Sequence, residues 1–213
     1  MKLLAATNNK GKIKELGEIL SGLGITVLTP QEAGLSLEVE ETGSTFEENA
    51  VLKARAWSEA SGMPSLADDS GLCVDSLGGR PGVLSARFAG EGASDGENIE
   101  LLLKSLKGVA GRSARFVCVA ALALPAGEVI TAEGRYEGVI IDTPLGTGGF
   151  GYDPVFFDPL AGKTLAQMGP EEKNARSHRR QALDGRSGAR GRRAARGTGI
   201  RLPQIPPDHW PAT

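Results

Sequence analysis

A long apolar segment near the middle of the chain constrains the fold more than any other feature. Residues 114–124 alternate between apolar and other side chains and then become continuously apolar, which is typical of a central strand. A Pro-Ala-Gly turn at residues 125–127 follows, and residues 129–141 have the composition of an antiparallel partner strand. The sequence therefore predicts a sheet that contains these two paired strands.

The first residues of the chain predict a strand, a helix and a second strand in succession. Residues 3–6 are a short apolar run, and residues 25–28 are another. A polar turn at residues 7–12 follows the first run, and apolar side chains then recur at helical spacing at Ile13, Leu16, Ile19 and Leu20. The chain is thus expected to begin with a β-α-β unit.

The polar turn before this first helix is a candidate anion site. Free backbone N–H groups and the helix dipole favour negative charge at a helix N-terminus, and Lys10 and Lys12 add to it. The turn does not have the Walker A pattern. The alternative is an ordinary capped helix with exposed lysines.

The clearest helix in the sequence covers residues 45–60. Thr45 can cap its N-terminus, and Glu48 stands three residues later, where a capping box requires it. Further helices are expected at residues 94–106 and 171–180.

Two adjacent carboxylates, Asp68 and Asp69, interrupt an apolar segment and are followed by Ser70 and Gly71. The Asp-Ser-Gly cluster indicates that a strand ends there, and successive strand side chains point to opposite faces. Carboxylates that lie close to other acids need a compensating cation or donor, and Mg²⁺ prefers carboxylate oxygen. Glu41 precedes the 45–60 helix and could reach such an ion. The alternative is a solvated turn.

A glycine-rich loop at residues 146–154 carries two aromatic residues, Phe150 and Tyr152. Glycines let the backbone approach a flat ligand, and an aromatic face can stack on a base, although a purely structural turn has the same composition. Lys173, His178 and neighbouring arginines suit a polyanion or a base edge. A lone histidine is more often structural.

Composition is that of an ordinary globular protein. The 213 residues fit one large domain or two lobes, and a net charge of -2 gives no general attraction to nucleic acid or membrane. Cys73 and Cys118 fit a reducing compartment, and the start of the chain predicts no signal peptide or membrane span, so a cytoplasmic location is expected. Residues 1–184 are expected to form the domain, and residues 185–213 a flexible basic tail.

Several motifs occur in one order along residues 2–184, and each is weak alone but specific in combination. They are Ala6-Thr7-Asn8-Asn9-Lys10-Gly11-Lys12, Glu40-Glu41-Thr42-Gly43, Thr45-Phe46-Glu47-Glu48-Asn49-Ala50 with Lys53-Ala54, Ala67-Asp68-Asp69-Ser70-Gly71-Leu72, Gly148-Gly149-Phe150-Gly151-Tyr152-Asp153-Pro154, and Glu172-Lys173-Asn174 with Ser177-His178-Arg179. Together they resemble the inosine/xanthosine triphosphate pyrophosphatase family. The resemblance implies an elongated, two-lobed α/β fold with a mixed, twisted β-sheet flanked by helices, an active site in the cleft between the lobes, and a homodimer.

The resemblance also implies an activity and a set of site residues. The activity is Mg²⁺-dependent hydrolysis of deaminated purine nucleoside triphosphates (dITP, ITP, XTP) to the monophosphate and pyrophosphate, which cleanses the nucleotide pool. Asp69 would be the general base and a metal ligand, with Glu41 and also Asp68 or Glu40 in the acidic site, and Ser70 would contact the substrate. The phosphates would be held by Thr7, Asn8, Asn9, Lys10, Gly11, Lys12 and Lys53. The base would be enclosed by Phe150, Gly151, Tyr152, Asp153, Lys173, His178 and Arg179.

The chemistry of the bases agrees with this assignment, because a 6-oxo purine offers an acceptor where adenine offers a donor. The chain departs from the family after Asp184, where an Arg/Gly tail that resembles a shifted reading frame replaces a continuing helix. The alternatives are a pyrophosphatase of similar fold for other nucleotides and a nucleotide-binding protein without turnover. The arginines of the tail could bind nucleic acid nonspecifically.

Overall fold

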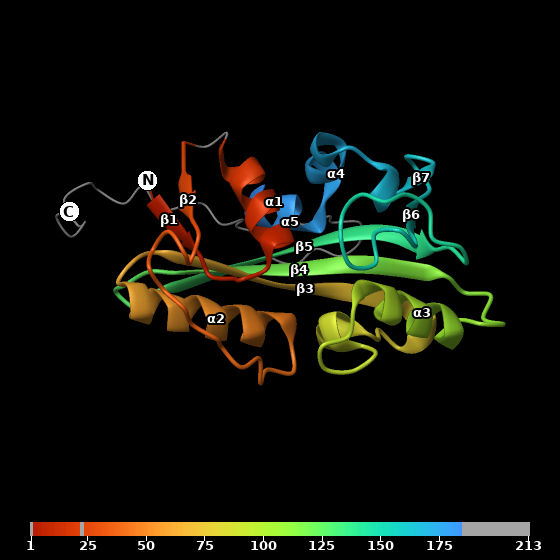
Figure 1. Cartoon of the computed structure of the whole chain (residues 1–213), viewed down its shortest axis with the longest axis horizontal. Coiled ribbons are helices and arrows are strands. Elements are labelled where there is room, and N and C mark those ends of the chain that lie inside the picture. The colour runs from red at the N-terminus through yellow and green to blue at the C-terminus, as the bar shows by residue number, and fades with distance from the viewer. Residues whose placement is uncertain (1, 22–23, 185–213) are drawn as a thin grey trace, which may run out of the picture.

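The computed structural model describes residues 2–21 and 24–184, and the strands within them form one seven-stranded sheet (Figure 1). Its order is β2-β1-β3-β4-β5-β6-β7. β1 pairs in parallel with β2 and β3, and all the other pairs are antiparallel, so the predicted mixed α/β sheet is confirmed. The strands are β1 (Lys2–Ala5), β2 (Thr26–Leu28), β3 (Ser65–Val74), β4 (Ser113–Ala123), β5 (Val129–Ile140), β6 (Phe156–Asp158) and β7 (Lys163–Thr164).

Helices flank both faces of the sheet. Figure 1 shows α1, α4 and α5 on one side of β3, β4 and β5, and α2 and α3 on the other. Successive side chains of β4 point to opposite faces of the sheet, so this strand contributes to the cores on both faces. Cys118 and Leu122 pack with α1 and α5, while Val119 and Ala121 pack with α2. The helices are α1 (Lys10–Ser21), α2 (Phe46–Ser61), α3 (Asp95–Ser105), α4 (Pro170–Arg176) and α5 (His178–Asp184).

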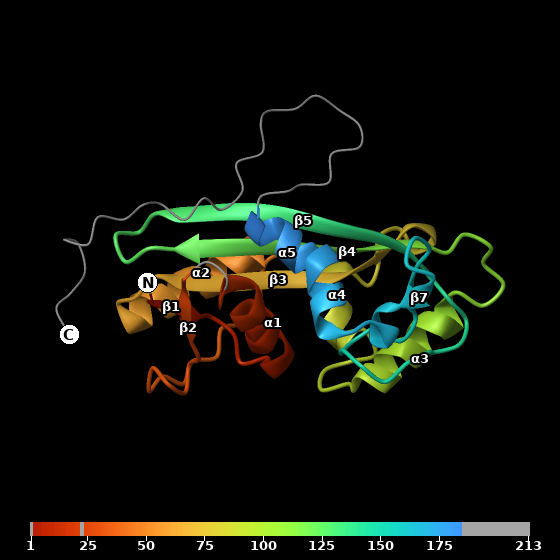
Figure 2. The same cartoon turned by 90° about the horizontal axis from the view of Figure 1, so that it is seen from above.

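The long strands β3, β4 and β5 extend past α1 and α2 to a separate hydrophobic core, which gives the molecule its elongated shape (Figure 2). In this core, Leu72 and Phe116 from the sheet pack with Leu102 of α3 and Phe156 of β6. The long strands therefore pack in hydrophobic clusters toward both of their ends. The middle of β3 lies beside the pocket described below.

β3 does not end at the Asp-Ser-Gly cluster, which corrects the expectation from the sequence. It pairs with β4 without interruption from Ser65–Ala123 to Val74–Ala114, so the ladder hydrogen bonds outweigh the weak strand propensity of Asp and Gly. Gly71 suits this position because a Cβ there would lie 2.3 Å from the carbonyl oxygen of Gly82.

The helix expected at residues 171–180 is in fact two helices, which is a second correction. Ser177 is extended, with φ -61° and ψ 150°, and separates α4 from α5. Its hydroxyl accepts a hydrogen bond from Arg180 N at 3.1 Å, and its carbonyl accepts one from Gln181 N at 3.0 Å. Ser177 thus caps α5, and the break changes the direction in which His178 and Arg179 point.

Local predictions elsewhere agree with the structure. Thr45 and Glu48 form the predicted capping box of α2, and the predicted helix α3 also begins with a capping box, formed by Ser94 and Glu97. Within residues 2–21 and 24–184, the structure has no helix of the length and apolarity that a membrane crossing requires. The predicted tail at residues 185–213 lies outside the described residues.

Candidate active site

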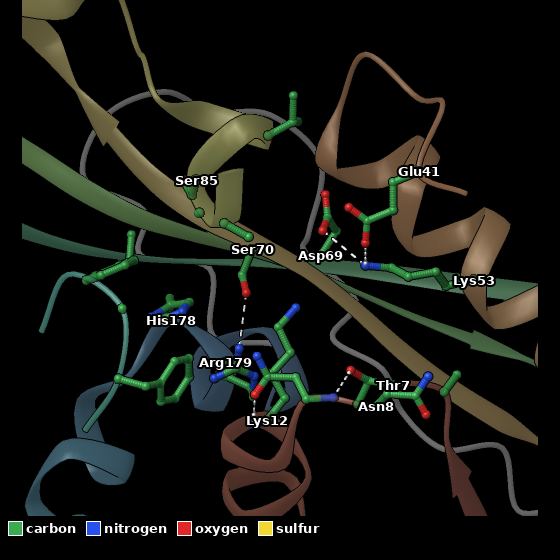
Figure 3. Close-up of a pocket in the computed structure, with 18 of the residues that line it drawn as sticks. Thr7, Asn8, Lys12, Glu41, Lys53, Asp69, Ser70, Ser85, His178 and Arg179 are labelled. Carbon is green, nitrogen blue, oxygen red and sulfur yellow. Dashed lines mark hydrogen bonds and ion pairs between the residues drawn. The ribbon is translucent and has the colours of Figure 1, made fainter. Parts of the chain in front are cut away.

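A pocket of about 330 Å³ lies along an open edge of β3. β1 pairs with β3 only through Ser65 and Leu66, so this edge has no strand partner over residues 67–72 in the part of the chain that the structure describes. The carbonyl oxygen of Asp68 accepts a hydrogen bond from Lys12 Nζ at 3.2 Å instead. Side chains from both faces of the sheet therefore reach one pocket (Figure 3).

Asp68 lies on the face of β3 that packs against α1 and α5. Its Oδ2 is 3.2 Å from Lys12 Nζ and 2.9 Å from Arg179 Nη2, and it accepts a hydrogen bond from Ser70 Oγ at 2.9 Å. Burial alone would raise the pKa of Asp68, but the charges of Arg179 and Lys12 outweigh burial and hold that pKa well below its usual range. Asp68 is therefore a fixed, buried anion at neutral pH.

Asp69 points to the opposite face, toward α2. Its Oδ1 is 3.1 Å from Lys53 Nζ, and its Oδ2 accepts a hydrogen bond from Asn49 Nδ2 at 3.3 Å. The same ammonium lies 2.5 Å from Oε1 of Glu41, so one lysine bridges two carboxylates. Burial raises the pKa of Asp69, and the Lys53 charge only partly offsets it. A carboxylate with a raised pKa is a stronger proton acceptor.

The capped start of α2 explains how this acidic pair is assembled. Asn49 and Lys53 are four residues apart and share one face of the helix. Asn49 Oδ1 accepts a hydrogen bond from Gly43 N at 2.7 Å, and Glu48 Oε2 accepts one from Ser44 N at 2.7 Å. The loop that carries Glu41 is thereby fastened to the helix that carries Lys53.

The turn before α1 contributes a polar wall. Asn9 Oδ1 accepts a hydrogen bond from Lys12 N at 3.1 Å, and Thr7 Oγ1 accepts one from Asn9 N at 3.2 Å, so this turn caps the helix. Lys10 is exposed and does not line the pocket. Gly11 faces the ring of Phe150 and does not line the pocket either.

The glycine-rich loop and α4 form a second wall around one buried ammonium. Lys173 Nζ lies 2.6 Å from Asp153 Oδ2, 2.8 Å from Glu15 Oε1 and 4.7 Å from the centre of the Phe150 ring. Asp153 Oδ2 also accepts a hydrogen bond from Phe150 N at 2.9 Å. The hydroxyl of Tyr152 donates to the carbonyl of Ser85 at 2.9 Å, which fastens the loop to the chain after β3.

His178 is a neutral, buried side chain. Its ring stacks on Phe116, with a centroid distance of 5.0 Å and an interplanar angle of 13°. Burial, followed by the charges of Arg179 and Lys173, lowers the pKa of His178 well below its ordinary value. Its Nδ1 is buried and has no hydrogen-bond partner among the residues that the structure describes. Arg179, by contrast, is bound by Asp68 and by Glu15.

Several residues of the pocket were not identified from the sequence. Glu15 follows Lys12 by three residues and precedes Ile19 by four, so helical spacing could have placed this acid on the inner face of α1. The sequence predicts Phe116 only as part of a central strand. Ser85, which accepts a hydrogen bond from Leu72 N at 2.8 Å, gave no signal in the sequence. The pocket also includes Asp95 and Asn98 of α3.

The pocket brings together most of the residues that the sequence predicts for the site. Glu40 is exposed and lies outside the lining, as Lys10 does, while Asp68 contacts lining side chains without itself lining the pocket. The predicted residues that line it are Thr7, Asn8, Asn9, Lys12, Glu41, Lys53, Asp69, Ser70, Phe150, Gly151, Tyr152, Asp153, Lys173, His178 and Arg179.

Glu41 and Asp69 are the side chains of this pocket that best suit a divalent cation. Their carboxylates converge on one position, which the ammonium of Lys53 occupies in this structure. The described residues contain no group of three or more His, Cys, Asp or Glu side chains that could hold a metal ion. Mg²⁺ usually takes one or two carboxylates and completes its shell with water and substrate phosphates, and this donor set fits that pattern.

Comparisons with known proteins agree on one family. The profile of the Ham1 family matches residues 3–186. The dITP/XTP pyrophosphatase of Geobacter sulfurreducens is 51% identical over 184 residues, which cover 85% of this chain and 92% of that protein, and that of Bacillus subtilis is 50% identical over 182 residues, which cover 84% and 92%. Among solved structures, the Ham1 protein of Staphylococcus aureus has a TM-score of 0.77 at 44% identity, with coverage of 86% and 95%. The Ham1 protein of Coxiella burnetii has a TM-score of 0.78 at 42% identity, with the same coverage.

Proposed function

Because this chain belongs to the Ham1 family, we propose that it hydrolyses deaminated purine nucleoside triphosphates, such as dITP and XTP, to the monophosphate and pyrophosphate. The relatives named dITP/XTP pyrophosphatase support this reaction. The observation that carries the proposal is the position of Asp69, a buried carboxylate that contacts Lys53 and Asn49. It lies in the same pocket as aromatic and cationic side chains that could surround a base, among them Phe150, Lys173 and Arg179.

The phosphates lie, in this proposal, between the N-terminus of α1 and the open edge of β3. Helix N-termini bind phosphate because their first N–H groups are free and the dipole favours negative charge. Lys12 and Lys53 reach the pocket from opposite faces of the sheet, and both are partly neutralised by aspartates. A triphosphate between them would meet two cations, one from each face of the sheet.

Glu41 and Asp69 would hold Mg²⁺. When bound there, the ion would neutralise charge that develops on the phosphate oxygens. The protein fixes the position of these two carboxylates: Asn49 donates to Asp69 Oδ2, and the fastened loop positions Glu41.

Asp69 is the proposed general base. A water molecule that attacks phosphorus must lose a proton, and an oxygen of the Asp69 carboxylate would accept it. Burial raises the pKa of Asp69, so the carboxylate accepts a proton more readily than an exposed aspartate would. Asn49 orients the group without adding charge.

The base would lie near Phe150, Phe116 and His178. Lys173 and Arg179 already contact acids, whereas Nδ1 of His178 has no hydrogen-bond partner within residues 2–21 and 24–184. If the ring turns on binding so that this nitrogen reaches the base, a neutral imidazole that carries its proton on Nδ1 can donate to a 6-oxo group, and it would meet a donor where adenine has its amino group. This contact favours hypoxanthine and xanthine over adenine, but guanine has the same 6-oxo group.

Pyrophosphate release from dITP, XTP, dGTP and dATP tests the proposal. With the full chain and Mg²⁺, dITP and XTP should give equal amounts of monophosphate and pyrophosphate at a much higher kcat/KM than dATP. Release of single phosphates, or no release from any of the four by a folded protein, would contradict the proposed function. Omission of Mg²⁺ should remove the activity.

A further inference from the structure

The ammonium of Lys53 lies where the two metal-binding carboxylates converge. Its Nζ is 2.5 Å from Glu41 Oε1 and 3.1 Å from Asp69 Oδ1 (Figure 3). The side chain of Lys53 is only 11% exposed and that of Asp69 only 8%, so water screens these charges little. The protein therefore provides its own cation for the pair that would hold Mg²⁺.

The two cations cannot use the same oxygens without a cost. Mg²⁺ binds oxygen at about 2.0–2.1 Å, which would bring it close to an ammonium that contacts the same two carboxylates. Two positive charges at such separation repel strongly in a partly buried site. The lysine stem is flexible and its ammonium can rotate away, whereas Asp69 is held within β3 and the loop of Glu41 is bound to α2 through Gly43.

We propose that Lys53 is an internal counter-ion that competes with the divalent cation for Glu41 and Asp69. This inference rests on the proposed function, because it takes those two carboxylates as the metal ligands. In the nucleotide-free protein the ammonium holds the pair together and weakens metal binding. A bound triphosphate offers the displaced ammonium new oxygens, so nucleotide and metal strengthen the binding of each other.

Other donors next to Glu41 and Asp69 would still partly compensate these two carboxylates if Lys53 were removed. Arg87 Nη1 lies 3.8 Å from Glu41 Oε2, and Asn49, a neutral donor, contacts Asp69. Lys12 pairs with Asp68 on the other face of β3. Without Lys53, the pair of carboxylates would keep only this partial compensation from the described residues and would attract a divalent cation more strongly.

Binding of Mn²⁺ to the nucleotide-free full chain tests the inference, with free Mn²⁺ measured by electron paramagnetic resonance. Lys53→Met should bind the ion at least about tenfold more tightly than the wild type, because a competing charge is gone. Lys53→Arg keeps a cation and should bind about as weakly as the wild type. Lys14→Met removes an exposed charge, 69% accessible, and serves as the matched control.

Unchanged or weaker Mn²⁺ binding by folded Lys53→Met would overturn the inference, and so would failure of all four proteins to bind the ion. If Lys53→Met does not fold, ¹³C-labelled lysine side chains in the wild type give a second readout, with Lys53→Arg to assign the signal. Addition of Mg²⁺ should shift the Lys53 resonance, and metal binding that leaves it unmoved would overturn the inference. Unchanged metal affinity in Lys53→Met together with normal pyrophosphate release by the wild type would reject the counter-ion and leave the proposed function intact.

Discussion

Asp68 and Asp69 are adjacent in the chain and bind cations on opposite faces of β3. Oδ2 of Asp68 lies 2.9 Å from Arg179 Nη2, and Oδ1 of Asp69 lies 3.1 Å from Lys53 Nζ. The first contact joins the strand to α5, and the second joins it to α2. One dipeptide thus connects the two layers of helices through the edge of the sheet, and the two carboxylates have different electrostatic environments.

Isosteric substitution of the two aspartates should have different effects on stability. Asp68→Asn leaves the guanidinium of Arg179, which is 1% exposed, with Glu15 as its remaining acid, and we expect it to lower the free energy of unfolding by about 3 kcal/mol. Asp69→Asn should leave the free energy of unfolding unchanged or slightly higher, because burial disfavours the charge that it removes. Urea unfolding at pH 7 measures both, and equal losses would contradict this account.

The stability of the wild type should depend on pH through Asp68. The pKa of Asp68 is held below its unfolded value of about 3.9, so its stabilisation is fully present above that pH and is lost as the pH falls further. The stability difference between wild type and Asp68→Asn should therefore be constant from pH 7 to pH 5 and should shrink below about pH 4. Urea midpoints at pH 7, 5 and 3.5 measure it, and a difference that shrinks already near pH 6 would assign the effect to another group.

His178 should remain neutral throughout the physiological range. Burial and the nearby charges of Arg179 and Lys173 lower its pKa, whereas a histidine of the unfolded chain gains a proton near pH 6.5. The folded state should therefore lose stability as the pH falls below about 6.5, while the ring stays unprotonated. In ¹³C-histidine NMR of a His209→Gln variant, the His178 signal should not titrate between pH 8 and 6. An inflection near pH 6.5 in the folded protein would contradict this.

Two glycines of α1 provide a matched test of the Phe150 position. A Cβ at Gly11 would lie 2.9 Å from the Phe150 ring, whereas a Cβ at Gly17 would meet nothing within 4 Å. Gly11→Ala should displace the ring and raise the KM for dITP severalfold. Gly17→Ala should leave KM unchanged and should stabilise the protein by about 0.5–1 kcal/mol, the usual gain in a helix interior. Equal KM values for the two variants would contradict the placement of Phe150 beside the base of the substrate.

Much of the fold was predictable because its signals are local. The capping boxes at Thr45 and Ser94 and the helical spacing of apolar residues in α1 each depend on residues within a few positions of one another. The divergence of Asp68 and Asp69 follows from strand geometry alone, although the expected strand end does not. The Ham1 membership agrees with the resemblance that the ordered motifs indicate.

The remaining features depend on contacts between distant segments. β3 continues through Gly71 because β4 pairs with it, and α4 ends at Arg176 because the next residue, Ser177, is extended and caps α5. The role of Glu15 follows from Lys173 and Arg179, which lie far along the chain. The assignment of Mg²⁺, the roles of individual site residues and the homodimer stay predictions.

The central claim is that Asp69 activates water for hydrolysis of the triphosphate. The most direct measurement is pyrophosphate release from dITP with Mg²⁺ by the wild type, by Asp69→Asn, and by Asp142→Asn, an exposed carboxylate outside the pocket. Asp69→Asn should fold and bind dITP but should lose about a thousandfold in kcat, as expected when a general base is removed, while Asp142→Asn should keep wild-type turnover. Turnover by Asp69→Asn within about tenfold of the wild type would contradict the account, because loss of a general base alone costs 10²–10⁴-fold.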